Sequence, residues 1–188
     1  MKVYIVRHGE SEANKNDLWS GWLDVALTEK GKQDAMSAGK ILSGVSFDKI
    51  YSSDLSRAKN TAEIAISGCE YETSPLLREF NAGSITGKKH DIISDEEKAH
   101  ASINGYSAYG GESIHELEQR VLEFMHKLET LDCENVAVFS HDGFLRSFLD
   151  MVINARTERK NICCHNCTVA IFEYNGEWWA LNSWINLR

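Results

Sequence analysis

The sequence is poor in the features that mark linkers and membrane spans. Its 188 residues include a single proline, Pro75, which argues against long Pro-rich linkers. No stretch approaches the roughly 20 apolar residues that a membrane-spanning helix needs. The N-terminus lacks a secretory core as well, because Arg7 interrupts the short apolar run that follows Lys2. We therefore expect a cytoplasmic protein with no membrane partner.

Excess positive charge is also missing, and so is an even number of cysteines. The formal net charge is -8, so we expect no nucleic-acid partner, because phosphate backbones need a broad basic face. Five cysteines without a secretory signal favour free thiols in a reducing compartment. Three of them lie in Cys163-Cys164-His165-Asn166-Cys167, but adjacent cysteines without a second Cys-rich half are not typical of a closed zinc site. A local positive pocket remains compatible with the acidic total.

The features that are present alternate along the chain. Short apolar runs bounded by turns predict strands buried in a mostly parallel sheet, and apolar residues at spacings of three and four predict helices. The expected strands are residues 3–6, 47–51 and 136–140, a weak strand at 70–74, and an edge hairpin of 168–174 and 178–182. The expected helices are residues 29–42, 55–66, 114–131 and 144–153, and a short one near 95–102. This alternation predicts an α/β fold, a three-layer α/β/α sandwich with a mostly parallel central sheet and an edge hairpin.

We expect one domain over residues 1–188, because no repeat, low-complexity tract or boundary interrupts this pattern. Residues 10–28 are predicted to be a loop that ends at Thr28, the N-cap of the next helix. Ser113 and Glu116 have the spacing of a capping box at the start of another helix. Residues 81–111 are the least regular stretch, and their length predicts a lid or substrate loop.

Three predicted strands end at residues that can carry chemistry. Arg7 and His8 follow the first strand, Arg57 lies just past the second, and His141 ends a later one. Parallel sheets of this kind bind ligands beyond the carboxyl ends of their strands. If these strands are neighbours, the three turns converge on one edge and form a cationic cup, which Gly9 would let a ligand approach.

A cup of this composition suits a phosphoryl group, which carries about two negative charges near neutral pH. Arg7 and Arg57 could each donate two parallel hydrogen bonds, and the amides that begin the helix of Arg57 could add dipolar stabilisation. The same positive charges disfavour protonation of His8, whose neutral ring keeps a lone pair to attack phosphorus. We expect His141 to donate to the transferred oxygens, and Glu79 to protonate the leaving alkoxide.

Seven segments carry or flank these residues. In chain order they are Arg7-His8-Gly9-Glu10, Leu27-Thr28-Glu29-Lys30-Gly31, Ser52-Ser53-Asp54-Leu55-Ser56-Arg57-Ala58, Leu77-Arg78-Glu79, Gly110-Gly111-Glu112-Ser113, Ser140-His141 and Asn182. In order and spacing they resemble the histidine phosphatase superfamily, the phosphoglycerate-mutase-like proteins, over nearly the whole chain. The resemblance implies a phosphohistidine on His8 and neither a metal nor a cofactor. It assigns Arg7, Arg57, His141 and Asn14 to the phosphate pocket, and it makes Glu79 the acid that later activates water.

The sequence departs from this family pattern in two places. Asp142 follows the second pocket histidine where relatives often carry glycine, and Ile85-Thr86-Gly87 stands where many phosphatases have Trp-Glu-Gly. We therefore add Asp142, and Lys88 just after the second departure, as candidate substrate-binding residues. If Asp142 faces the cup, it should repel substrates that carry a second anion nearby.

The sequence thus predicts a metal-independent phosphomonoesterase that hydrolyses a small phosphorylated metabolite through a phosphohistidine on His8. A cofactor-dependent phosphoglycerate mutase would use the same pocket and return the phosphoryl group to the product. A protein of another class, a non-catalytic phospho-ligand-binding module, would keep Arg7 and Arg57 without a working acid. The sequence is compatible with a homodimer, and it identifies neither the substrate nor the pathway.

Overall fold

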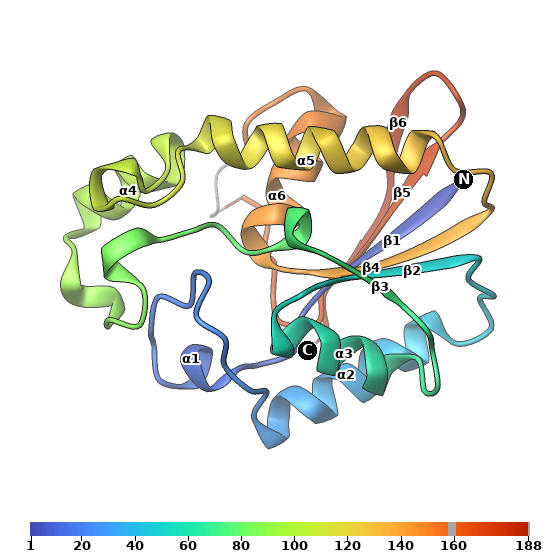
Figure 1. The fold of residues 1–188 in the computed structure, drawn as a ribbon, viewed down its shortest axis with the longest axis horizontal. Helices are drawn as coiled ribbons and strands as arrows, with labels where there is room; N and C mark the ends of the chain where they lie inside the picture. Colours follow the sequence, from blue (N-terminus) through green and yellow to red (C-terminus); the bar gives the residue numbers. More distant parts are fainter. Residues whose placement is uncertain (158–160, 188) are drawn as a thin grey trace.

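The computed structural model describes residues 1–157 and 161–187, which fold around a six-stranded sheet (Figure 1). The strands are β1 Lys2–Arg7, β2 Lys49–Ser53, β3 Glu72–Ser74, β4 Asn135–Ser140, β5 Val169–Tyr174 and β6 Trp179–Ile185, in the spatial order β3-β2-β4-β1-β5-β6. β1, β2, β3 and β4 are parallel, and β5 and β6 form an antiparallel hairpin at one edge. The predicted α/β sandwich with a mostly parallel sheet is confirmed.

The helices cover both faces of this sheet. They are α1 Glu12–Lys15, α2 Glu29–Leu42, α3 Ser56–Ala65, α4 Asp95–Asn104, α5 Ile114–Glu129 and α6 Asp142–Ile153. In Figure 1, α2 and α3 lie on one side of the sheet, and α5 and α6 lie on the other. Successive residues of β1 serve the two layers in turn: Val3 and Ile5 join the core under α5 and α6, whereas Tyr4 and Val6 join the core under α2 and α3.

Most expected elements form close to their predicted bounds, because local capping sets them. Thr28 accepts from the amide of Gly31 at 3.0 Å, and Ser113 with Glu116 forms the predicted capping box. The second strand begins later than predicted, at Lys49. Asp48 instead binds the amides that begin β4, and Phe47 packs on Tyr4 away from the strand ladder.

Two stretches that the sequence presented as irregular have more structure than expected. Residues 10–28 were predicted to be a loop, but they contain α1, whose N-cap is Ser11. Residues 81–111 contain α4 and three short 3₁₀ turns, and they lie beyond the carboxyl ends of the strands, at the left of Figure 1. Buried side chains from this stretch, including Ile93 and Tyr106, join the core under α5. Whether part of it moves as a lid stays a prediction.

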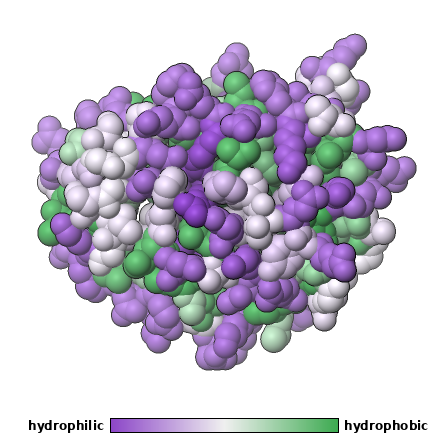
Figure 2. Space-filling model, viewed as in Figure 1, coloured by the Kyte–Doolittle hydropathy of each residue, from purple (hydrophilic) through white to green (hydrophobic). Residues whose placement is uncertain are grey.

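Hydrophilic residues cover most of the face shown in Figure 2, and hydrophobic residues occur there in small separate areas. None of the helices within residues 1–157 and 161–187 has the length and apolar character that crossing a membrane requires.

Candidate active site

His8 lies just past the end of β1, and its two ring nitrogens have different partners. Nδ1 contacts the carbonyl oxygen of Gly9 at 2.7 Å, and Nε2 lies 3.2 Å from Nε of Arg57. A carbonyl can only accept and a guanidinium can only donate, so the ring carries its proton on Nδ1 and its lone pair on Nε2. Burial lowers the pKa of His8 well below its usual value, and the charges of Arg57 and Arg7 lower it further. The predicted neutral nucleophile therefore matches the geometry.

Arg57 is the second residue of α3, and its side chain is completely buried. Besides the bond to His8, Nη1 donates to the carbonyl of Leu23 at 2.7 Å and Nη2 donates to that of Gly21 at 2.9 Å. Burial lowers the pKa of Arg57 to about 10, so the guanidinium stays charged near neutral pH. These contacts occupy one N–H of each nitrogen, and the remaining N–H groups of Nη1 and Nη2 are free to bind an anion.

Asp24 fixes the start of α3 and so the position of Arg57. Its carboxylate accepts from the amide of Ser56 at 2.7 Å and from the Ser56 hydroxyl at 2.8 Å. The preceding amide, that of Leu55, is bound by the hydroxyl of Ser53. The sequence suggested that amides at this helix start would bind phosphate. The structure gives the amides of Leu55 and Ser56 to side chains, so these two are not available to phosphate, and a contribution from the amide of Arg57 stays a prediction.

His141 is the N-cap residue of α6, and its ring faces that of His8 with centroids 5.0 Å apart. Both ring nitrogens are buried, and neither has a hydrogen-bond partner among the described residues. Burial lowers the pKa of His141 well below its usual value, with Arg57 and His8 as further causes. A buried donor without a partner is costly. The ring is therefore suited to an oxygen of a bound ligand.

Arg7, the last residue of β1, is anchored at the opposite side of His8. Nη1 donates to the carbonyl of Cys164 and lies 3.8 Å from the carboxylate of Asp142. Asp142 also accepts from Nε of Arg146 at 2.9 Å, so one carboxylate serves two arginines. Nε of Arg7 is buried without a partner among the described residues, as are the His141 nitrogens. These donors converge where the sequence predicted a cup.

Glu79 reaches the site from the segment that follows β3. Its Oε1 accepts from the amides of Phe80 and Gly143, both at 2.8 Å. Gly143 is needed here because a Cβ at this position would lie 2.5 Å from Oε1. The other oxygen, Oε2, makes no hydrogen bond to the described residues and is the atom available for proton transfer.

Asn14 helps to cap α1 and also lines the active-site cavity. It completes the capping box of α1, because its Oδ1 accepts from the amide of Ser11 at 3.1 Å, and it also accepts from Asn166 at 3.2 Å. Because Oδ1 is occupied, its amide nitrogen is the group that can reach a ligand.

A cavity of about 380 Å³ opens above this cup. Arg7, Asn14, Glu79 and Asp142 line its inner part. The lining also includes Trp19, Phe80, Tyr106, His90, Lys98 and Ser102, which come from the loop before α2 and from the 80–106 region. The structure does not bring Lys88 to this cavity, since that side chain is exposed outside it. Lys98 of α4 lies in the wall instead.

Sequence reasoning missed the residue that holds the Glu79 segment. Arg120 of α5 donates from Nη1 to the carbonyls of Leu76 and Arg78 and from Nη2 to that of Glu79, and its Nε pairs with Glu112 at 2.8 Å. A signal was present, because Arg120 falls on the apolar stripe of α5, where a charged residue needs buried partners. The stabilising partners are backbone carbonyls, which no side-chain pattern reveals.

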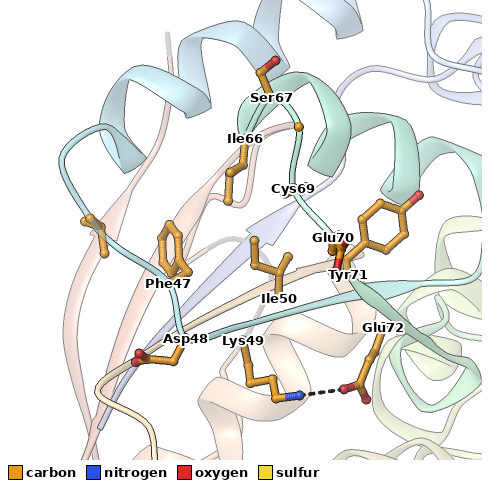
Figure 3. A pocket seen from close by; sticks show the side chains of 12 residues that line it. Phe47, Asp48, Lys49, Ile50, Ile66, Ser67, Cys69, Glu70, Tyr71 and Glu72 are labelled. Atoms are coloured by element: carbon orange, nitrogen blue, oxygen red, sulfur yellow. Dashed lines mark hydrogen bonds and ion pairs between the residues drawn. The ribbon is translucent and has the colours of Figure 1, made fainter.

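Two other places among the described residues are candidates for a functional site: the cysteines near the active site and a larger cavity. Burial raises the pKa of Cys164 and of Cys167 to about 12, so both stay thiols, and the described residues contain no cluster of metal-binding side chains. A larger cavity of about 540 Å³ lies at the amino ends of β2 and β3 (Figure 3). Its rim carries the ion pair of Lys49 with Glu72, over apolar residues such as Phe47 and Ile50.

Comparisons with known proteins agree with this arrangement. The family model described as "Histidine phosphatase superfamily (branch 1)" matches residues 3–187. A protein described as "Probable phosphoglycerate mutase GpmB" from Salmonella choleraesuis is 32% identical over 195 residues, which cover 98% of this chain and 90% of that protein.

Two solved structures share the fold along their whole length. One, a "putative alpha-ribazole-5'-P phosphatase" from Escherichia coli, has a TM-score of 0.86 at 28% identity and covers 99% of this chain and 97% of its own. The other, a phosphoglycerate mutase from Thermus thermophilus, has a TM-score of 0.79 at 27% identity and covers 100% of both chains. The relatives thus include both phosphatases and mutases. The chain belongs to the histidine phosphatase superfamily, branch 1.

Proposed function

We propose that this protein is a phosphomonoesterase that hydrolyses a small phosphorylated metabolite through a phosphohistidine on His8. One observation carries the proposal. A neutral imidazole with its lone pair on Nε2 lies beside two side chains whose buried nitrogens lack partners among the described residues: Nε of Arg7, and the ring of His141, which offers one N–H when neutral. A tetrahedral oxyanion beside His8 would accept from Nε of Arg7 and from the N–H of His141, and its charge would match that of the two arginines.

In the first step, Nε2 of His8 attacks phosphorus and a new N–P bond forms while the ester P–O bond breaks. Before the attack, Arg57 turns its Nε–H from His8 to a phosphoryl oxygen, which frees the lone pair on Nε2, and Arg7 and His141 bind the other oxygens. The charge that develops on these oxygens is stabilised by donors that are already held in place. Arg57, for example, is held by its hydrogen bonds to the carbonyls of Leu23 and Gly21. Glu79 gives its proton to the departing alkoxide, and the alcohol leaves.

In the second step, Glu79 is a carboxylate and takes a proton from water. The oxygen of that water bonds to phosphorus, the N–P bond breaks, and the electron pair returns to Nε2 of His8. Inorganic phosphate leaves, and Glu79 is again protonated. The sum is ester plus water to alcohol plus phosphate, and it requires no metal.

The test uses p-nitrophenyl phosphate, labelled substrate to trap the phosphoenzyme, and a panel of phosphorylated metabolites. We expect many turnovers per chain, label retained on the denatured enzyme, and loss of both in His8→Ala. Hydrolysis by His8→Ala at the parent rate would overturn the proposal. Stoichiometric binding without turnover would instead identify a phospho-ligand-binding module.

A phosphoglycerate mutase is the second candidate, and the relative named as a probable phosphoglycerate mutase favours it. The two activities share the pocket and differ in whether the phosphoryl group passes to water or back to the organic product. Assays with 3-phosphoglycerate, with and without a bisphosphoglycerate primer, separate them. We expect release of phosphate to exceed interconversion of the phosphoglycerates, and the opposite order would assign the mutase reaction.

A further inference from the structure

A second cavity, of about 440 Å³, lies beside the active-site cavity between α4, α5 and α6. The two cavities adjoin each other, since they share three lining residues, Phe80, Ser102 and Tyr106. Phe80 and Tyr106 are in edge-to-face contact, with ring centroids 4.9 Å apart. The rest of the second cavity is largely apolar, with Ile114 and Leu117 of α5 in its wall.

Two polar atoms in this apolar wall lack partners. Ser147 of α6 is only 5% exposed, and its hydroxyl has no hydrogen bond to any described residue. Its neighbour in the chain is Arg146, whose Nη1 is also buried without a described partner. Leaving such donors unpaired costs free energy that a water molecule or a ligand oxygen can recover. Both residues line the second cavity and neither lines the first.

The charge near these donors favours an anion. Asp142 is the shared counter-ion of Arg146, at 2.9 Å, and of Arg7, at 3.8 Å, so two guanidinium groups face one carboxylate. The contact of Arg146 with that carboxylate is made by Nε and not by Nη1. This leaves a positively charged donor for a second oxyanion.

Two other charged residues line this cavity. Asp150 accepts from the amide and the hydroxyl of Thr157, and Arg156 forms an ion pair with Glu118 at 2.6 Å. Glu118 thus neutralises Arg156. Thr157 supplies only neutral donors to Asp150, which keeps its negative charge, so an anionic ligand must bind at Arg146 and Ser147 and not beside Asp150.

We propose that this cavity is a second binding site, for a small carboxylate with an apolar body. The carboxylate accepts hydrogen bonds from Nη1 of Arg146 and from the hydroxyl of Ser147, and the apolar body lies against Ile114 and Leu117. The ligand is proposed as a separate molecule because the donors without partners that would hold it, on Arg146 and Ser147, do not line the active-site cavity. This site is independent of the reaction proposed for His8.

The probe is hexanoate, titrated into the full-length protein by calorimetry, with hexan-1-ol as the uncharged molecule of equal length. We expect saturable binding of one hexanoate and much weaker binding of the alcohol. Saturating orthovanadate, which mimics phosphate in the cup, should leave the affinity for hexanoate unchanged. Loss of hexanoate binding in vanadate would mean that hexanoate occupies the active-site cavity, which would overturn the proposal.

Two variants locate the site. Ser147→Ala removes one donor, and we expect the dissociation constant to rise about tenfold, the usual effect of losing a hydrogen bond to a charged group. Ala99 lines the second cavity but not the active-site cavity. Ala99→Phe places a ring in the second cavity and should abolish binding. Thermal unfolding of both variants checks their folding. Parent-like affinity in both folded variants, equal binding of the alcohol, or no binding to the parent would each overturn the proposal.

Discussion

Nε of Arg57 donates to Nε2 of His8 across 3.2 Å, although the two residues are 49 positions apart in the chain. The contact joins the start of α3 to the end of β1, and it fixes the orientation of the imidazole, with Nε2 toward Arg57. It also helps to keep the ring neutral, because a positive charge beside it disfavours a second proton. One arginine thus orients the nucleophile and supplies part of the anion site.

Replacing Arg57 by lysine should lower kcat/KM about 10²- to 10³-fold, the usual effect of losing one preorganised donor to the transition state. Lysine keeps the charge, but it cannot bind both carbonyls and phosphate at once. Steady-state kinetics with p-nitrophenyl phosphate measure the effect. The same change at Arg78, which pairs with Asp54 outside the cavity, is the control and should stay within about twofold, as for a partly exposed ion pair. Equal effects of the two changes would contradict the role of Arg57.

Glu79→Gln should slow esters with poor leaving groups far more than p-nitrophenyl phosphate. An alkoxide needs the proton of Glu79, a contribution of about 10²- to 10⁴-fold, whereas p-nitrophenolate leaves without it. Because the second step also needs Glu79, the variant should release a burst of p-nitrophenol and accumulate phosphohistidine. Rapid-mixing kinetics with phenyl and p-nitrophenyl phosphate test this, with the exposed Glu12→Gln of α1 as control. If Glu79→Gln slows both esters equally and gives no burst, Glu79 is not the general acid and base.

Lys98→Ala should raise KM for a phosphorylated carboxylate such as 3-phosphoglycerate about two- to fivefold, the size of a partly exposed ion pair, and should spare p-nitrophenyl phosphate. Lys98 lines the cavity, where its side chain is 33% exposed. Lys88→Ala is the matched control, because Lys88 lies outside the cavity. A larger rise in KM from Lys88→Ala than from Lys98→Ala would instead make Lys88 the substrate-binding residue, as the sequence suggested.

Asp142→Asn should change the order of preference among substrates. The carboxylate lines the cavity, so removing its charge should lower KM for bisphosphates and phosphocarboxylates relative to p-nitrophenyl phosphate. The variant should also lose about 2 kcal/mol of stability, because Arg7 and Arg146 lose their shared counter-ion while they retain some contact with solvent. Substrate profiling and thermal unfolding give the two readouts. An unchanged order of substrates would exclude electrostatic selection by Asp142.

The stability of the protein should fall as the pH drops below about 6.5, the ordinary pKa of histidine. Folding lowers the pKa of both His8 and His141, so below that pH the unfolded chain binds protons that the folded chain does not. Stability therefore rises with pH in this range, by up to about 1.4 kcal/mol per pH unit for each histidine.

Denaturant unfolding between about pH 5 and 7.5, the range that brackets the ordinary histidine pKa, measures this slope. His8→Gln should reduce the slope, whereas His126→Gln, on the exposed side of α5, should not. The same slope in the parent and in His8→Gln would show that burial of His8 makes no contribution.

Much of the architecture follows from local rules in the sequence. Apolar runs that end in Arg7-His8 and Ser140-His141 locate the buried strands, and caps such as Thr28 and Ser113 set where helices begin. Capping depends on hydrogen bonds within a few residues, so a sequence specifies it directly. The boundary of β2 was less accurate, because Asp48 is held by amides of the distant β4.

The sequence by itself determined that Arg7 and His8 follow one buried strand, that His141 follows another, and that Arg57 lies just past a third. The tertiary structure decided that β2, β4 and β1 are neighbours, which brings these residues to one edge of the sheet. Only the tertiary structure decided which way the other candidates point. Glu79 reaches the cup because Gly143 leaves room for it, Asp142 is held between Arg7 and Arg146, and Lys98 takes the position expected of Lys88. Those outcomes depend on contacts between segments far apart in the chain, and the spacing of residues along a sequence does not encode them.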